Sequence, residues 1–100
     1  MVKHIVLWKL KEDLSTEEKA NVKREIKEGL EGLKEKIKEL VEIKVNIDGL
    51  EGSTVDVMLD TVFENEDALK IYASHPDHVA VGMAKIKPFM AERICYDYEF

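Results

Sequence analysis

The chain is 100 residues long, with 45% hydrophobic residues, 36% charged residues and a net charge of −6. This composition is typical of a single globular domain, which we expect to span residues 1–100, and its acidic balance argues against nucleic acid or an anionic membrane surface as a partner. A single cysteine, no signal-peptide pattern and no apolar run near the roughly 20 residues that span a bilayer favour a cytoplasmic location.

The first part of the chain predicts a strand followed by a long helix. Residues 2–10 are rich in β-branched and aromatic side chains, which favours a strand. Ser15 and Glu18 have the spacing of a capping box at a helix start. Gly29 and Gly32 each weaken the helix, and either a close approach to the sheet offsets this cost or the helix bends there. An apolar stripe at helical spacing continues to residue 40: Val22, Ile26, Leu30, Leu33, Ile37 and Leu40.

The rest of the chain predicts three strands and a broken helix. Residues 41–48 alternate between apolar and polar side chains, which indicates a half-exposed strand, and residues 53–63 form the next strand. Asn65 caps a short helix. Pro76 breaks that helix and begins another, because proline fits the first helical position, and this last helix carries its apolar stripe as far as Met90. Residues 94–100 alternate again and predict a closing strand.

The order of elements is βαββαβ, which indicates an α+β fold. With right-handed crossovers it gives a ferredoxin-like, four-stranded antiparallel sheet with strand order 4-1-3-2 and the second helix broken at Pro76. Helices cover one face of such a sheet, but the first and third strands are apolar on both faces. An open apolar face of this size is unusual in a monomer. We therefore expect a homodimer through the open face, a dimeric α+β barrel.

Polar chemistry concentrates at residues 72–78, which hold two of the three histidines. The third, His4, lies in the first strand on the face that we expect to point toward the helices. A phenol and imidazoles can exchange protons near neutral pH without a metal or cofactor. If the fold brings His4 against Tyr72 and His78, the three form a pocket capable of acid–base function.

Three of these residues also have structural interpretations. His4 would then be a core histidine hydrogen-bonded to the backbone or to residues 72–78, because buried polar groups need partners. Tyr72 would be a core aromatic with a satisfied hydroxyl. His75 precedes Pro76 and is better explained as a cap of the following helix than as a functional residue.

His78 is the strongest catalytic candidate. With Pro76 at the first helical position it falls in the first turn, where the helix dipole disfavours a charged imidazolium, although Asp77 acts in the opposite direction. A general base needs a neutral imidazole near pH 7. We expect no metal site and no cofactor, because no fourth ligand joins the histidines and phosphate-loop or dinucleotide motifs are missing. Cys95 is expected to be structural or buried at the dimer face.

Three segments match a known family: residues 2–7, the Tyr72-x-x-His75-Pro76-x-His78 motif and Asp97-Tyr98. Together they resemble the stress-responsive A/B barrel domain family, the dimeric α+β barrels. That family includes uncharacterised bacterial proteins, plant stress-induced proteins and a plant polyketide cyclase that closes its substrate by an aldol condensation without a cofactor. Resemblance to this cyclase implies that His4, Tyr72 and His78 line a pocket between sheet and helices, with His78 as the base.

Three functions are compatible with these residues. The first is a cofactor-independent enzyme acting on a small hydrophobic carbonyl compound, such as a polyketide-type cyclase. The second is a non-catalytic dimer that binds a small hydrophobic or aromatic ligand or takes part in a stress response, and the third is a cofactor-free monooxygenase of aromatic polyketides. An open cavity beside His78 would favour the enzymes, whereas a cavity filled by Trp8, Phe89 and Met90 would favour a structural role.

Overall fold

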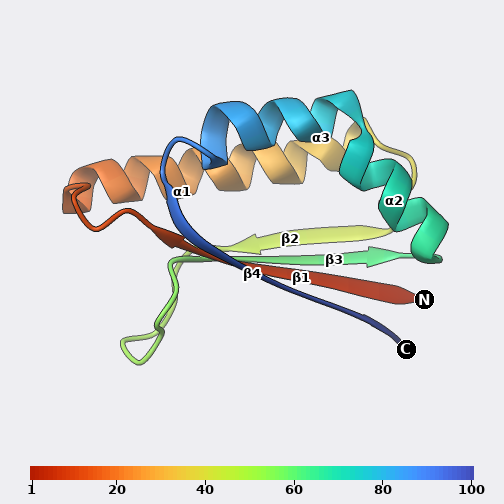
Figure 1. Ribbon diagram of the computed structural model, residues 1–100, viewed down its shortest axis with the longest axis horizontal. Coiled ribbons are helices and arrows are strands. Elements are labelled where there is room, and N and C mark those ends of the chain that lie inside the picture. The colour runs from red at the N-terminus through yellow and green to blue at the C-terminus, as the bar shows by residue number, and fades with distance from the viewer.

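A layer of helices packs on one face of a four-stranded antiparallel sheet (Figure 1). The computed structural model describes residues 1–100. The sheet order β2-β3-β1-β4 is the predicted order read from the other edge, and it confirms the ferredoxin-like topology. The strands are β1 (Val2–Leu10), β2 (Glu42–Asn46), β3 (Val57–Phe63) and β4 (Met90–Glu99). The helical elements are α1 (Thr16–Glu31), η1 (Gly32–Glu35), α2 (Glu66–Ser74), α3 (Pro76–Val81) and η2 (Gly82–Ile86).

The hydrophobic core lies between the helices and one face of the sheet. Even-numbered residues of β1 are buried there, because side chains alternate between the two faces of a strand. Burying an aliphatic or aromatic side chain in this way contributes about 1.5–3 kcal/mol each. The main contributors are Val2, Val6, Trp8 and Leu10 of β1, Val57, Leu59 and Phe63 of β3, and Val22, Ile26 and Leu30 of α1.

Several predicted boundaries were wrong, including both ends of β2, which spans Glu42–Asn46 and not residues 41–48. α1 ends at Glu31 and not at residue 40, because the chain tightens into the 3-10 turn η1 and then reverses toward β2. The apolar residues that follow, Leu33, Ile37 and Leu40, are nevertheless buried in the core. Their helical spacing therefore reflects burial and not a continuous helix. β3 begins at Val57 rather than at residue 53, after a loop. Met90 is not helical but opens β4, where it pairs with Leu10.

Gly29 marks a close approach between two helices. A Cβ atom placed on Gly29 would lie 3.1 Å from Cγ1 of Val81 in α3. The approach expected from the sequence is therefore real, but the neighbour is α3 and not the sheet.

α1 begins with the predicted capping box. Oγ of Ser15 accepts a hydrogen bond from the amide of Glu18 at 3.0 Å, and Oε1 of Glu18 accepts one from the amide of Ser15 at 3.0 Å. We expect Ser15→Ala to lower the free energy of unfolding, measured in urea, by about 1 kcal/mol. Ser74→Ala should cost less, because its hydroxyl donates back to the carbonyls of Lys70 and Ile71 within α2 and satisfies no free amide. Equal losses in the two variants would contradict the role of the cap.

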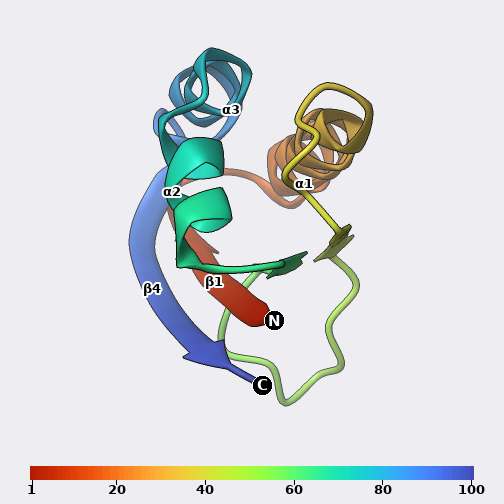
Figure 2. The ribbon, with the colours of Figure 1, turned by 90° about the vertical axis from the view of Figure 1, so that its right-hand side faces the viewer.

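The other face of the sheet carries no helix, and only the loop of residues 47–56 extends on that side (Figure 2). The pairing of β1 with β4 sets Ile5 opposite Tyr96 and Leu7 opposite Ile94 on this face. Tyr96 is 70% exposed and Ile94 is 51% exposed. We call the apolar residues here the open-face patch: Ile5, Leu7, Met58, Ile94, Tyr96 and Tyr98. None of the helices has the length and hydropathy that a membrane span requires.

Candidate functional site

The fold places His4, Tyr72 and His78 side by side. His4 comes from the centre of the sheet, Tyr72 from the last turn of α2 and His78 from the first turn of α3. The ring centroids of Tyr72 and His78 are 4.3 Å apart, and those of His4 and Tyr72 are 6.4 Å apart. Their spatial convergence was expected from the sequence, and their catalytic role stays a prediction.

These three residues line a cavity of about 340 Å³ between the sheet and the α2–α3 layer. Nine of its 14 lining residues are hydrophobic. Trp8 and Met90 form part of the wall, but Phe89 does not, so these side chains do not fill the space beside His78. A mostly apolar cavity of this size with a few polar groups is typical of a site for a small organic ligand.

His78 is held as a neutral imidazole with a defined tautomer. Nδ1 lies 3.0 Å from the carbonyl oxygen of Ala73, and because a carbonyl can only accept, Nδ1 carries the proton. Nε2 is left as the basic nitrogen. Burial lowers the pKa of His78, opposed by the bond to Ala73 and assisted by the positive charge of Arg93. The expected direction follows, but its main cause is burial rather than the helix dipole.

His4 is paired with an acid that the sequence reasoning did not assign to the site. The imidazole is only 8% exposed, and its Nδ1 lies 2.5 Å from Oδ1 of Asp97. The carboxylate must accept, so Nε2 of His4 is also free. Asp97 lies directly opposite His4 in the pairing of β1 with β4. His4 is a buried, hydrogen-bonded histidine, as its structural interpretation required, but the expected partner was wrong, because the imidazole bonds to Asp97 and not to the backbone or to residues 72–78.

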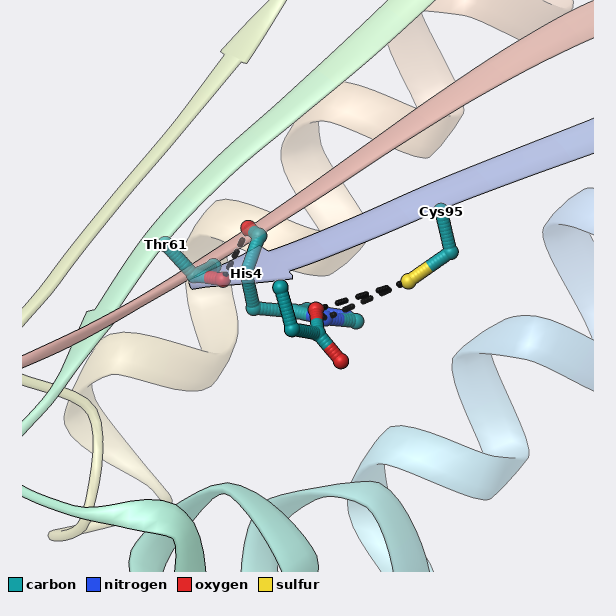
Figure 3. A network of polar contacts seen from close by, with 4 residues as sticks. His4, Thr61 and Cys95 are labelled. Carbon is teal, nitrogen blue, oxygen red and sulfur yellow. Dashed lines mark hydrogen bonds and ion pairs between the residues drawn. The ribbon is translucent and has the colours of Figure 1, made fainter. Parts of the chain in front are cut away.

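Cys95 extends the pair into a network, in which Figure 3 shows His4 and Cys95 linked across the two strands. Sγ of Cys95 lies 3.7 Å from Nδ1 of His4 and 3.5 Å from Oδ1 of Asp97. Cys95 pairs with Val6 and therefore faces the helix side, so its expected place at the dimer face was wrong. Burial and Asp97 raise the pKa of its thiol.

The same network is the group of side chains able to hold a metal ion. The ligand atoms of His4, Cys95 and Asp97 lie within 4.8 Å of one another. The set weighed from the sequence, three histidines, is not assembled in this way, because His75 acts as a cap. In the present arrangement the three groups hydrogen-bond to one another, with the thiol protonated at neutral pH.

The side chain of Tyr72 has no hydrogen-bond partner, whereas that of His75 has one. Tyr72 is 0% exposed, and its hydroxyl is buried without a hydrogen-bond partner. Burial raises the pKa of this phenol well above 10, so it remains protonated. A satisfied hydroxyl, as the structural interpretation required, is therefore not observed. Nδ1 of His75, by contrast, accepts from the amide of Asp77 at 3.1 Å and caps α3, as predicted.

The lowered pKa of His78 makes stability depend on pH. The unfolded chain binds a proton near 6.5, whereas the folded chain resists it, so the free energy of unfolding should decrease as the pH falls below about 6.5. We expect His78→Gln to reduce this dependence, measured by urea denaturation across the range, and ring NMR of His78 to show a midpoint below 6.5. A midpoint at or above that value would contradict the burial argument.

The stress responsive A/B barrel domain profile matches residues 2–100. Among curated proteins, none matches the sequence significantly. A dimeric protein of unknown function with a ferredoxin-like fold from Bacteroides fragilis is 42% identical, with a TM-score of 0.94 over 99% of this chain and 95% of that chain.

Two further solved structures are more distant. A dimeric ferredoxin-like protein of unknown function from Thermobifida fusca is 25% identical, with a TM-score of 0.82 over 99% of this chain and 90% of that chain. A hydroxynitrile lyase from Passiflora edulis is 17% identical, with a TM-score of 0.77 over 97% of this chain and 90% of that chain, and the likeness shows a shared fold alone. By its sequence over nearly the whole length and by its fold, the chain belongs to the stress responsive A/B barrel domain family.

Proposed function

We propose that this protein is an acid–base enzyme acting on a small hydrophobic carbonyl compound, with the cavity beside His78 as its active site. The observation that carries the proposal is the buried, unpartnered hydroxyl of Tyr72, a residue that lines the cavity together with two imidazoles. Leaving such a hydroxyl unpaired costs about 1–3 kcal/mol of folding free energy. A carbonyl oxygen in the cavity would give it the missing acceptor.

Tyr72 and His78 take different roles, because the phenol of Tyr72 stays protonated and the imidazole of His78 is neutral. His78 is neutral at pH 7, so its Nε2 can take a proton from the carbon next to the substrate carbonyl. Tyr72 cannot serve as the base, because its pKa is raised, but its hydroxyl can donate to the oxygen on which negative charge develops. The resulting enolate can then attack a second carbonyl of the same molecule, which is the chemistry of an aldol cyclisation.

His4 supplies the second imidazole of the proposed site. Its bond to Asp97 fixes the ring so that Nε2 is the free nitrogen, and its ring centroid lies 6.4 Å from that of Tyr72 and 6.5 Å from that of Phe63. We assign it to binding a second polar group of the substrate. Asp97 acts through His4 and is therefore a positioning residue.

The proposed enzyme is a homodimer joined through the open-face patch. The dimeric relative from Bacteroides fragilis, at 42% identity, supports this assembly. The exposed aromatic rings of β4 support it too, because a contiguous apolar surface on one sheet face is expected to be covered. The cavity lies on the opposite, helix-covered side and would stay accessible in such a dimer.

The test is proton exchange in D₂O with a simple aryl alkyl ketone, followed by NMR. Wild-type protein should accelerate deuterium incorporation next to the carbonyl, and His78→Gln should reduce this rate by about 10²-fold or more. His75→Gln is the matched control, because His75 caps α3 outside the cavity, and it should leave the rate unchanged. If the ketone binds in the cavity but its proton exchange is not accelerated, the enzyme proposal is wrong and the protein is a non-catalytic, ligand-binding dimer.

A further inference from the structure

We propose that the natural ligand of this cavity carries a carboxylate at the end remote from its reacting carbonyl, bound by Arg93 and Lys87. The inference rests on the proposed function of the same cavity and adds the charge of the substrate to it. It follows from three properties of the charged residues around the cavity: they are cations, they have no acidic partner, and they lie at its exposed end.

The charge of the cavity is opposite to that of the protein. The chain has 21 acidic and 15 basic residues, so a surface sampled at random would be acidic. Two of the cavity's 14 lining residues, Lys87 and Arg93, are cations, and none is Asp or Glu. The cavity is therefore a positively charged site on an acidic protein, which favours entry of an anion.

Neither cation has an acidic partner within the chain. The ion pairs of the protein involve Lys3, His4, Lys27, His75 and Lys85, and neither Lys87 nor Arg93 is among them. Arg93 lies within reach of the Cys95 thiol, and a guanidinium has five N–H donors, so it keeps donors available for a ligand. Arg93 lines the same cavity as His78, and its positive charge adds to the effect of burial, which is the main cause of the lowered pKa of His78.

The two cations and the proton-transfer groups occupy different depths. Tyr72 is buried and His78 is half-buried, whereas Lys87 and Arg93 are exposed. Arg93 lies on β4 opposite Trp8, and Lys87 follows η2. The apolar wall, which includes Val6 and Met83, completes the lining of the same cavity. A ligand that fits has a carbonyl at the buried end, an apolar middle and an anion at the exposed end.

The proposal can be tested with benzoylbutyrate and its methyl ester, which share an aryl ketone and differ in one charge. Calorimetry should show the acid binding about ten-fold more tightly than the ester, because charge-assisted hydrogen bonds are the stronger ones. The preference should fall to near unity in the double variant Arg93→Gln/Lys87→Gln, with the affinity for the ester unchanged. Arg24→Gln is the matched control, since Arg24 lies on α1 outside the cavity, and it should keep the full preference.

The outcomes separate this inference from the proposed function. Equal binding of acid and ester, or a preference that survives the double substitution, overturns the inference, while proton exchange on the bound ester would leave the enzyme proposal standing. A preference for the acid without exchange on either compound supports the anionic ligand and overturns the catalysis. Absence of binding by both compounds overturns the inference, and the aryl alkyl ketone test then decides the enzyme proposal by itself.

Discussion

Ile94→Glu should convert the proposed dimer into monomers of 11.5 kDa in sedimentation equilibrium at micromolar concentration. Ile94 lies in the open-face patch opposite Leu7, and a carboxylate there would have to be buried without a partner. Burying an unpaired charge costs several kcal/mol of binding free energy, and a two-fold symmetric interface contains the substituted residue twice. The dissociation constant should therefore rise by about a hundred-fold or more.

Ile71→Glu provides the matched control for this experiment. Ile71 is 49% exposed on α2, and Ile94 is 51% exposed on β4, so the two substitutions change nearly equal amounts of apolar surface. They differ in the layer on which they lie, because α2 belongs to the helix layer. The control should remain dimeric. Dissociation of both variants, or of neither, would mean that the open face of the sheet is not the interface.

Tyr72→Phe should separate stability from activity. The hydroxyl is buried and unpartnered, so its removal should leave the free energy of unfolding unchanged or raise it by about 1 kcal/mol, measured in urea. The same change removes the donor proposed to stabilise the enolate oxygen. Proton exchange on the ketone should then slow by about 10²–10³-fold, which is typical for the loss of one such donor.

Tyr96→Phe is the comparison for this second variant. Tyr96 lies on the open face of the sheet, away from the cavity, and its loss of a hydroxyl should not alter the exchange rate. A large loss of stability in Tyr72→Phe would show that its hydroxyl has a structural partner in solution. An unchanged exchange rate would remove Tyr72 from the proposed mechanism.

Much of the fold could be predicted because its signals are local. The alternation in β1, the capping box at Ser15 and the break at Pro76 each need only a few neighbouring residues to be recognised. The end of α1 could not be predicted in this way. Leu33, Ile37 and Leu40 keep a helical spacing although they lie beyond Glu31, because a 3-10 turn and a reversal can bury the same side chains.

The parts of the candidate site that depend on which face of a strand or helix carries a residue could be predicted. The parts that depend on the register between paired strands could not. His4 was expected to face the helices, and the motif at residues 72–78 was expected to meet it. Asp97 was missed because its contact with His4 joins residues 93 positions apart, and only the pairing of β1 with β4 sets them opposite each other. The misplacement of Cys95 had the same cause, since a shift by one residue moves a side chain to the other face.

The wall of the cavity contains the single tryptophan of the chain, Trp8, and this gives the molecule a built-in optical reporter. Indole emission responds to the polarity of its surroundings, and the neighbourhood of this ring changes when an organic molecule replaces solvent beside it. With no second tryptophan to add a background, fluorescence of the unlabelled protein can register occupancy of the site by compounds that are never turned over. A library of carbonyl compounds can therefore be screened for binding by tryptophan fluorescence before any reaction is known.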